Sequence, residues 1–232
     1  MKIGFIGLGI MGAPMAQHLL AAGHELFVPK RSKVPDFLSA ATVCATNADV
    51  ARAADVIILM LPDTPDVDKV LFGKDGVAQG LTNGSGNGKS IGKTVVDMSS
   101  ISPMETKRFA LAINELGCDY LDAPVSGGEV GAKAASLTIM IGGDESVFER
   151  IKPLFELMGK NITLVGGNGD GQTTKVANQI IVALNIAADQ GDVFAHQLKQ
   201  RFDTLKNSLI APNHDGQAGG FCAHFTTGHG CV

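Results

Sequence analysis

Short apolar segments recur along the first two thirds of the chain, and polar turns separate them. Their residues are rich in β-branched side chains, and Gly, Pro, Asp or Asn stands at most of their ends. We predict β-strands at KIGFI, ELFV, TVCAT, VIILM, TVVDM, CDYLD, LTIMI and ITLV, which are residues 2–6, 25–28, 42–46, 56–60, 94–98, 118–122, 137–141 and 162–165.

A second pattern, with apolar residues three and four positions apart, predicts helices between several of these strands. The clearest cover residues 11–23, 102–117 and 144–159, and each ends in glycine, a common helix stop. Strands that alternate with helices indicate right-handed βαβ units. The fold class we expect is therefore α/β, a doubly wound and mostly parallel sheet with helices on both faces.

The strand pattern stops near Gly167 and gives way to one long helix. We therefore predict a domain boundary there, with one domain over residues 1–166 and a different segment over 167–232. Two stretches carry no apolar rhythm: the Gly/Ser/Asn-rich Gly80–Lys93, which we expect to be a surface loop, and the tail from about Asp189.

The sequence GLGIMG directly follows the first strand and opens the first helix, which is the context of a dinucleotide-binding GxGxxG turn. The first glycine makes the turn, the second lets a pyrophosphate approach the backbone, and the third lets helix and strand pack closely. The helix N-terminus adds amide donors and a partial positive charge. The expected cofactor contacts are Gly7, Leu8, Gly9, Ile10, Met11 and Gly12.

The residues after the second strand bear on the choice of dinucleotide. An acid there would hold the ribose 2′-hydroxyl of NAD, but the chain reads Pro29-Lys30-Arg31-Ser32. Lys30, Arg31 and Ser32 can pair with a 2′-phosphate, which favours NADP while leaving NAD possible. The alternative is that the two cations are solvated loop charges.

Two further strand ends supply candidate cofactor contacts, because ligands of open α/β sheets bind at the carboxyl ends of strands. One end carries Leu61, Pro62 and Asp63, and the other carries Ser99 and Ser100. Ser102-Pro103 follows closely, and for Ser102 a helix N-cap is the better interpretation.

The long helix begins with an unusual combination of side chains. Lys175, Asn178 and Gln179 share one face by their i, i+3, i+4 spacing, whereas Val176, Ile180 and Leu184 form an opposite face with core-like spacing. A polar trio on an apolar helix needs solvent, protein or substrate as its hydrogen-bond partner.

Composition excludes several classes of function. The net charge is −4 with no run of Lys or Arg, which gives no support to nucleic-acid binding or to a polybasic membrane contact. The four cysteines form no CxxC pair, which suits a cytoplasmic protein. No apolar run reaches membrane-spanning length. The tail residues Cys222, His224, His229 and Cys231 fit no common zinc-finger spacing, and we expect no metal site.

Five motifs together resemble the β-hydroxyacid dehydrogenase family, in the order in which that family carries them. They are FIGLGIMGAPMAQHL, LPDTPDV, VDMSSISP, YLDAPVSGGEVGA and GDGQTTKVANQIIVALN. The resemblance implies a Rossmann domain, then a long helix and an all-helical domain, and reduction of a small carboxylated aldehyde with NADH or NADPH. It implies Lys175 and Asn178 as catalytic residues, and a substrate site formed by Ser126, Gly127, Gly128 and Gln179.

The resemblance ends at about Ala188, so residues 167–232 read as the interdomain helix plus an atypical remnant of the second, all-α domain. Members of the family are homo-oligomers, and we expect this chain to lack most of their interface. We also expect an exposed apolar face on the long helix, and cofactor binding that survives better than turnover. Within the family, the substrate we expect is 2-hydroxy-3-oxopropanoate (tartronate semialdehyde), giving glycerate. The alternatives are a 3-hydroxyisobutyrate dehydrogenase-like enzyme and an impaired dinucleotide-binding remnant.

Overall fold

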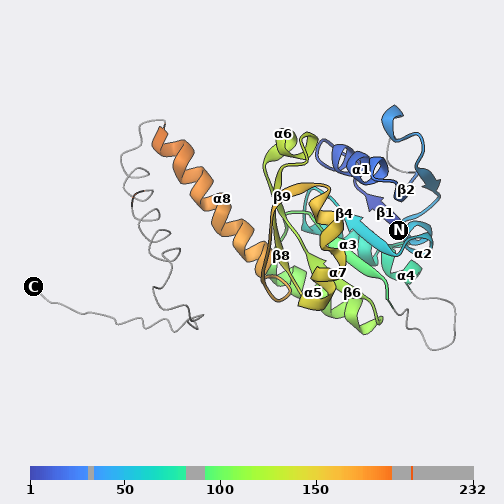
Figure 1. The fold of residues 1–232 in the computed structure, drawn as a ribbon. Coiled ribbons are helices and arrows are strands. Elements are labelled where there is room, and N and C mark those ends of the chain that lie inside the picture. Colours follow the sequence, from blue (N-terminus) through green and yellow to red (C-terminus); the bar gives the residue numbers. More distant parts are fainter. Residues whose placement is uncertain (31–33, 82–91, 190–199, 201–232) are drawn as a thin grey trace, which may run out of the picture. The chain divides into compact units, whose positions relative to one another are not determined.

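A computed structural model describes residues 1–30, 34–81, 92–189 and 200 of the chain. Its strands form a nine-stranded sheet in the order β3-β2-β1-β4-β5-β6-β8-β7, with β9 paired to β8 (Figure 1). The strands are β1 (Lys2–Ile6), β2 (Glu25–Pro29), β3 (Thr42–Cys44), β4 (Val56–Leu59), β5 (Thr94–Asp97), β6 (Asp119–Asp122), β7 (Val125–Ser126), β8 (Leu137–Gly142) and β9 (Gly159–Gly166).

All eight predicted strands are present, and β7 is the one that the sequence pattern missed. Its two residues are too short for any periodicity to register. The predicted parallel arrangement is confirmed for β1 to β6 and for the pair β8 and β9. The exception is β8, which runs antiparallel to both β6 and β7.

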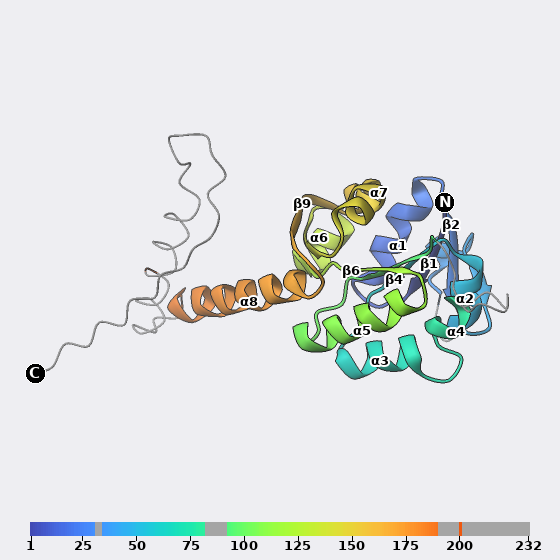
Figure 2. The ribbon, with the colours of Figure 1, turned by 90° about the horizontal axis from the view of Figure 1, so that it is seen from below.

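Helices cover both faces of the sheet, as the alternation of strands and helices predicts (Figure 2). The described helices of four or more residues are α1 (Gly12–Ala21), α2 (Asn47–Ala53), α3 (Thr64–Phe72), α4 (Val77–Leu81), α5 (Pro103–Glu115), α6 (Gly128–Lys133), α7 (Glu145–Glu156) and α8 (Asp170–Asp189). In Figure 2, α1, α6 and α7 lie on one side of the sheet, and α2, α3, α4 and α5 lie on the other.

The alternation of side chains along each strand produces two separate hydrophobic cores. On β4, Val56 and Ile58 pack in the core that α1 and α7 cover, whereas Ile57 and Leu59 pack under α3, α4 and α5. All four side chains are almost fully buried. A strand buried on both faces reads as a continuous apolar run, which is what VIIL is.

Four short helices, α2, α3, α4 and α6, are absent from the sequence prediction. The prediction that a loop begins at Gly80 is wrong, because Gly80 and Leu81 are buried in α4. A Cβ on Gly80 would lie 2.1 Å from the carbonyl oxygen of Ala48, so glycine permits close packing of α4 on α2. At the other end, Lys93 Nζ donates to the carbonyl oxygens of Ala51 and Ala54 near the end of α2. Residues 82–91 lie outside the described part of the chain.

The predicted long helix is confirmed as α8, and no strand follows β9 within the described residues. Contacts between Cα atoms divide the chain into two units, Met1–Gln179 and Ile180–Val232. The boundary predicted at residues 166/167 stays a prediction. The Cys/His-containing tail and most of the segment after Asp189 lie outside the described residues. None of the described helices is long and apolar enough to cross a membrane.

Candidate functional site

The turn between β1 and α1 has the stereochemistry that each glycine of GLGIMG was predicted to provide. Gly7 has φ +108°, and a Cβ there would lie 2.1 Å from the carbonyl oxygen of Met60. A Cβ on Gly12 would lie 1.9 Å from the carbonyl oxygen of Gly7. At Gly9 a Cβ would meet no atom within 4 Å, so this backbone is open on its outer side. The turn therefore fits the close approach of a phosphate group.

A cavity of about 260 Å³ lies beside this turn, at the carboxyl ends of β1, β2 and β4. It contains the predicted contacts Gly7, Leu61 and Pro62. The remaining lining residues, which the sequence reasoning missed or assigned no role, are Ile6, Pro29, Asn47, Asp66, Lys69 and Val70. Asn47 begins α2, and the last three lie on α3. Recognising α3 as a helix after the Asp63 cap would have pointed to them.

Other predicted cofactor contacts lie around this cavity with different roles. Asp63 is the N-cap of α3, and its carboxylate accepts a hydrogen bond of 2.6 Å from the Thr64 amide. Ile10 is 71% exposed at the tip of the turn, and Leu8 and Met11 pack against the core that α1 covers. Lys30 is exposed directly after β2. Arg31 and Ser32 lie outside the described residues.

Ser99 is fully buried, and its groups join two strand ends. Its hydroxyl oxygen accepts a hydrogen bond of 3.0 Å from the Leu61 amide, and its own amide donates to Asp97 Oδ1 at 3.0 Å. Ser100 is exposed at the same strand end. Ser102 is the N-cap of α5, which confirms its interpretation as a helix signal.

Lys175 lies in the second turn of α8 and is only 8% exposed. Its ammonium donates a hydrogen bond of 3.1 Å to Gln179 Oε1. Burial lowers the pKa of the Lys175 ammonium below its ordinary value of 10.5. A buried ammonium with a lowered pKa gives up its proton more readily than a surface lysine does.

Asn178 connects α8 to the loop that the DAPVSGG motif forms. Its Nδ2 atom donates to Ser126 Oγ at 3.4 Å, so the lysine helix and the β7 end lie side by side. The next two residues, Gly127 and Gly128, have φ of +128° and +59°, a left-handed pair that only glycine adopts readily. All six predicted catalytic and substrate residues thus lie at β7, at the start of α6 or on one face of α8.

The other face of α8 differs from its prediction as a core face. Val176 is 47% exposed and Ile180 is 51% exposed, and Leu184 is partly buried. The side chains that are buried in the first turns are instead polar, namely those of Gln172 and Lys175. The expectation of an exposed apolar stretch on this helix is therefore confirmed for Val176 and Ile180.

A buried carboxyl group holds the start of α8 against the sheet. Asp122, at the end of β6, accepts hydrogen bonds from the Gly169 amide at 2.7 Å and the Gln172 amide at 3.0 Å. Burial raises the pKa of Asp122 to about 6, against the lowering effect of these amide donors. Burial likewise raises the pKa of Asp97, which accepts a hydrogen bond from the Tyr120 hydroxyl.

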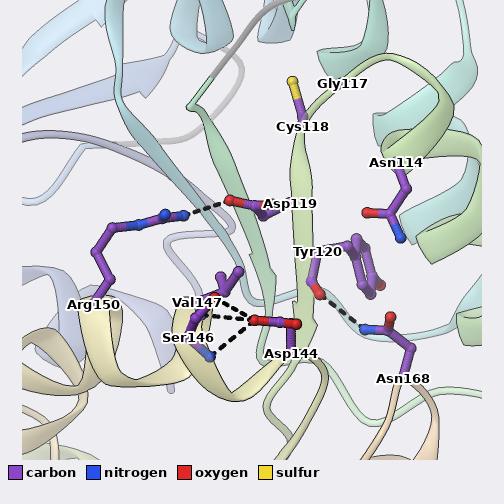
Figure 3. Close-up of a pocket in the computed structure, with 10 residues that line it drawn as sticks. All are labelled: Asn114, Gly117, Cys118, Asp119, Tyr120, Asp144, Ser146, Val147, Arg150 and Asn168. Atoms are coloured by element: carbon purple, nitrogen blue, oxygen red, sulfur yellow. Dashed lines mark hydrogen bonds and ion pairs between the residues drawn. The ribbon is translucent and has the colours of Figure 1, made fainter.

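A larger pocket, of about 510 Å³, lies elsewhere, at the start of β6 and the N-terminus of α7 (Figure 3). Its polar groups largely satisfy one another. Figure 3 shows Arg150 reaching Asp119, Asp144 accepting hydrogen bonds at the start of α7, and Asn168 donating to the carbonyl oxygen of Tyr120. Its size alone does not make it the functional site. Among the described residues, no group of three or more His, Cys, Asp or Glu side chains could hold a metal ion.

Comparisons with known proteins show that most of the chain resembles an NAD-binding domain. Residues 2–167 match the family described as the NAD binding domain of 6-phosphogluconate dehydrogenase. The chain is 63% identical over 190 residues to 2-hydroxy-3-oxopropionate reductase of Escherichia coli K12, covering 81% of this chain and 62% of that protein.

Two solved structures extend the comparison. A Mycobacterium tuberculosis 3-hydroxyisobutyrate dehydrogenase with L-serine matches with a TM-score of 0.71 and 32% identity, over 91% of this chain and 71% of that one. A protein called Psf3, in complex with NADP+ and 2-OPP, matches with a TM-score of 0.69 and 29% identity, over 82% and 68% of the two chains. The chain spans about three fifths of the length of the first curated relatives that it matches.

Proposed function

This chain belongs to the β-hydroxyacid dehydrogenase family, and from that premise we propose that it reduces 2-hydroxy-3-oxopropanoate to glycerate with NAD(P)H. The observation that carries the proposal is the hydrogen bond between Asn178 and Ser126. It brings the helix with the buried Lys175 next to the glycine pair of the DAPVSGG loop. A proton donor and a carboxylate-binding loop then face one small substrate.

The cofactor part of the proposal rests on the turn at Gly7–Gly12. The open side of Gly9 and the first amides of α1 suit a pyrophosphate, and the cavity beside Leu61 and Pro62 suits the rest of a dinucleotide. When bound, NAD(P)H supplies the hydride. We favour NADP because exposed Lys30 follows β2 where NAD-specific domains carry an acid, although NAD remains compatible with the turn.

The polar groups near Ser126 and Lys175 have separate roles in the proposed reaction. The Ser126 hydroxyl and the amides of Gly127 and Gly128 bind the substrate carboxylate, because consecutive amides in such a turn form an anion-binding nest. Lys175 polarises the aldehyde oxygen and gives it a proton as the carbon is reduced. Gln179 accepts a hydrogen bond from Lys175 and fixes the direction of its ammonium.

A 3-hydroxyisobutyrate dehydrogenase-like activity is the second candidate. The match to the Mycobacterium tuberculosis structure favours it, whereas the 63% identity to the Escherichia coli reductase favours the first. Initial rates with 2-hydroxy-3-oxopropanoate and with the 3-hydroxyisobutyrate/methylmalonate-semialdehyde pair separate the two. We further propose residues 1–166 as the dinucleotide-binding domain, residues 167–232 as the interdomain helix with a partial second domain, and a cytoplasmic location.

The experiment that tests the reductase proposal compares the wild-type chain with Lys175→Met. NADPH binding is titrated by fluorescence, and aldehyde reduction is followed at saturating NADPH. Loss of the proton donor should slow reduction by roughly 10²–10⁴-fold while the NADPH dissociation constant stays within about twofold. Reduction rates that are measurable and equal in the two proteins would refute the role of Lys175. We also expect NADPH binding by this chain to be better preserved than turnover.

A further inference from the structure

Gln172 lies one turn before Lys175 on α8, and its side chain is a buried connection between that helix and the sheet. It is 1% exposed. Its Nε2 donates to the carbonyl oxygen of Ser99 at 2.7 Å, and its Oε1 accepts from the amide of Ile101 at 3.0 Å. The carboxamide therefore clamps both ends of the segment after β5.

Few other side chains can make this pair of bonds. Glutamate offers no donor for the Ser99 carbonyl, methionine offers neither group, and asparagine is one methylene shorter. Both backbone groups are buried where the clamp holds them, so losing either partner leaves an unsatisfied polar group. Only glutamine has both the length and the two hydrogen-bonding groups that this clamp needs. A side chain that merely filled space would not have to meet these requirements.

The clamp continues to the cavity beside the glycine turn. Ser99 Oγ accepts a hydrogen bond from the amide of Leu61, which lines that cavity. Exposed Ser100 lies between the two residues that Gln172 holds. A chain of hydrogen bonds thus joins Leu61, through Ser99 and Gln172, to the helix that carries Lys175.

The position of the Lys175 ammonium depends on where α8 lies as well as on its hydrogen bond to Gln179. Asp122 fixes the backbone of the first turn through the Gly169 and Gln172 amides, and Gln172 fixes its side-chain face. The hydrogen bond from Lys175 to Gln179 stays within the same helix and does not anchor it to the sheet. Two side chains three residues from Lys175 thus connect α8 to other elements: Asn178 bonds to Ser126, and Gln172 bonds to the segment after β5, on the side of the cavity.

We propose that Gln172 is a positioning residue: it locks α8 to the Ser99–Ile101 segment and so sets where the Lys175 ammonium stands relative to a bound dinucleotide. The inference rests on the proposed function. It predicts that dinucleotide binding and the surroundings of Lys175 are coupled through Gln172. A misplacement of about 1 Å at such a site can cost about 10²-fold in rate.

The test measures the ¹³Cε resonance of Lys175 during a pH titration, with and without NADP+, on the full chain. Lys175→Arg assigns the resonance by its disappearance. The variants are Gln172→Met, which loses both bonds, and Gln172→Glu, which keeps only the acceptor for Ile101. Asp144→Ala is the control, because it removes the N-cap of α7, and the hydrogen bonds of its carboxylate go to Ser146 and Val147 and not to α8. Circular dichroism and an NADPH titration accompany each variant.

In the wild type we expect a lysine pKa below 10.5 and a resonance that moves when NADP+ binds. In Gln172→Met the pKa should return toward that of an exposed lysine and the NADP+ response should disappear, while NADP+ still binds. In Gln172→Glu, the Lys175 pKa and its response to NADP+ should lie between those of the wild type and those of Gln172→Met. If Gln172→Met does not fold, Gln172→Glu provides the test. Asp144→Ala should behave like the wild type.

Two other outcomes separate the possible failures. If the wild-type resonance ignores bound NADP+, the proposed function fails, because Lys175 is then remote from the cofactor. If the wild type responds and the folded Gln172 variants respond equally, only the positioning role is overturned. Where turnover is measurable, Gln172→Met should lower kcat by about 10–100-fold with little change in the NADPH dissociation constant.

Discussion

At the scale of single residues, the three glycines of GLGIMG have different requirements. Gly7 and Gly12 are fixed by the fold, since a Cβ on either would lie about 2 Å from a backbone oxygen. Gly9 has free space around it, so its requirement comes only from a ligand. A substitution at Gly9 should therefore affect cofactor binding without affecting folding.

Gly9→Ala should therefore fold with wild-type stability and bind NADPH at least about tenfold more weakly, a loss of about 1.4 kcal/mol. The added methyl group occupies the space through which a pyrophosphate reaches the turn. Gly167→Ala is a matched control, because a Cβ there also meets no atom within 4 Å. Thermal denaturation and an NADPH titration on both variants check the prediction. Unchanged affinity in Gly9→Ala would place the dinucleotide elsewhere.

Asp122 makes stability depend on pH in an unusual direction. Its pKa is raised from 3.8 to about 6 in the folded protein, so the folded state holds a proton that the unfolded state has already released between these values. The free energy of unfolding must then fall as pH rises through this window, by about 3 kcal/mol for a shift of about two units.

Asp122→Asn should remove this dependence, because an amide resembles the protonated acid. Chemical denaturation at about pH 4 and about pH 7 measures the free energy of unfolding of both proteins. Between these pH values, the free energy of unfolding of Asp122→Asn should rise by roughly 2–3 kcal/mol relative to that of the wild type. A difference that stays constant with pH would show that the folded-state pKa of Asp122 is not raised.

At the scale of elements, short helices depend on their caps more than on their length. Helix α2 has seven residues, and it begins with a capping box in which Thr46 Oγ1 accepts from the Asp49 amide at 3.0 Å and the Asp49 carboxylate accepts from Thr46. A helix this short gains little from propensity alone. The cap and the packing of Val50 hold it in place.

Thr46→Ala should lower the free energy of unfolding by about 1 kcal/mol, since an unsatisfied amide remains at the helix start. Thr46→Ser keeps the accepting oxygen, so it should lower the free energy of unfolding by only about a few tenths of a kcal/mol. Urea denaturation of the two variants compares them directly. Equal losses would mean that the methyl group of Thr46, and not its hydroxyl, provides the stabilisation.

An element could be predicted from the sequence when it is long enough for its apolar positions to repeat at a regular spacing. The eight strands, α1, α5, α7 and α8 each repeat an apolar position at least twice, and the turn at Gly7 has a spacing with one physical meaning. Helix α6 and strand β7 could not be predicted this way, because six and two residues contain no repeat. Their place is set by the pairing of β7 with β8.

In the candidate site, too, some residues could be predicted from sequence patterns and others could not. Lys175, Asn178 and Ser126 were found through their motifs, and their proximity needed the antiparallel turn of β7 against β8 to bring them together. Asn47 and Lys69 reach the cavity from helices that the pattern did not reveal. Gln172 gave no signal in sequence, since its role depends on backbone groups of a segment some 70 positions away.

At the scale of the whole molecule, the sheet is covered on both faces, while α8 presents apolar residues to solvent. Val176 and Ile180 lie on successive turns at 47% and 51% exposed. Exposed apolar residues that adjoin one another favour association. We therefore predict that copies of this chain associate through the exposed surface around Val176 and Ile180.

Ile180→Lys should shift the chain toward the monomer, because a charge opposes burial of this surface. Sedimentation velocity over a range of protein concentrations measures the effect. Leu111→Lys is the control, since Leu111 is 62% exposed and belongs to a different helix, α5. Equal sedimentation of wild type and Ile180→Lys at every concentration would contradict a role for this surface.

The central claim places a dinucleotide on the glycine turn with its nicotinamide facing Lys175. The most direct measurement is a crystal structure of the chain with NADPH. We predict phosphate oxygens hydrogen-bonded to the amides at the start of α1, and the nicotinamide and Lys175 Nζ on opposite sides of one substrate-sized space. Electron density for the dinucleotide at another place, or a lysine directed away from the ring, would contradict the account.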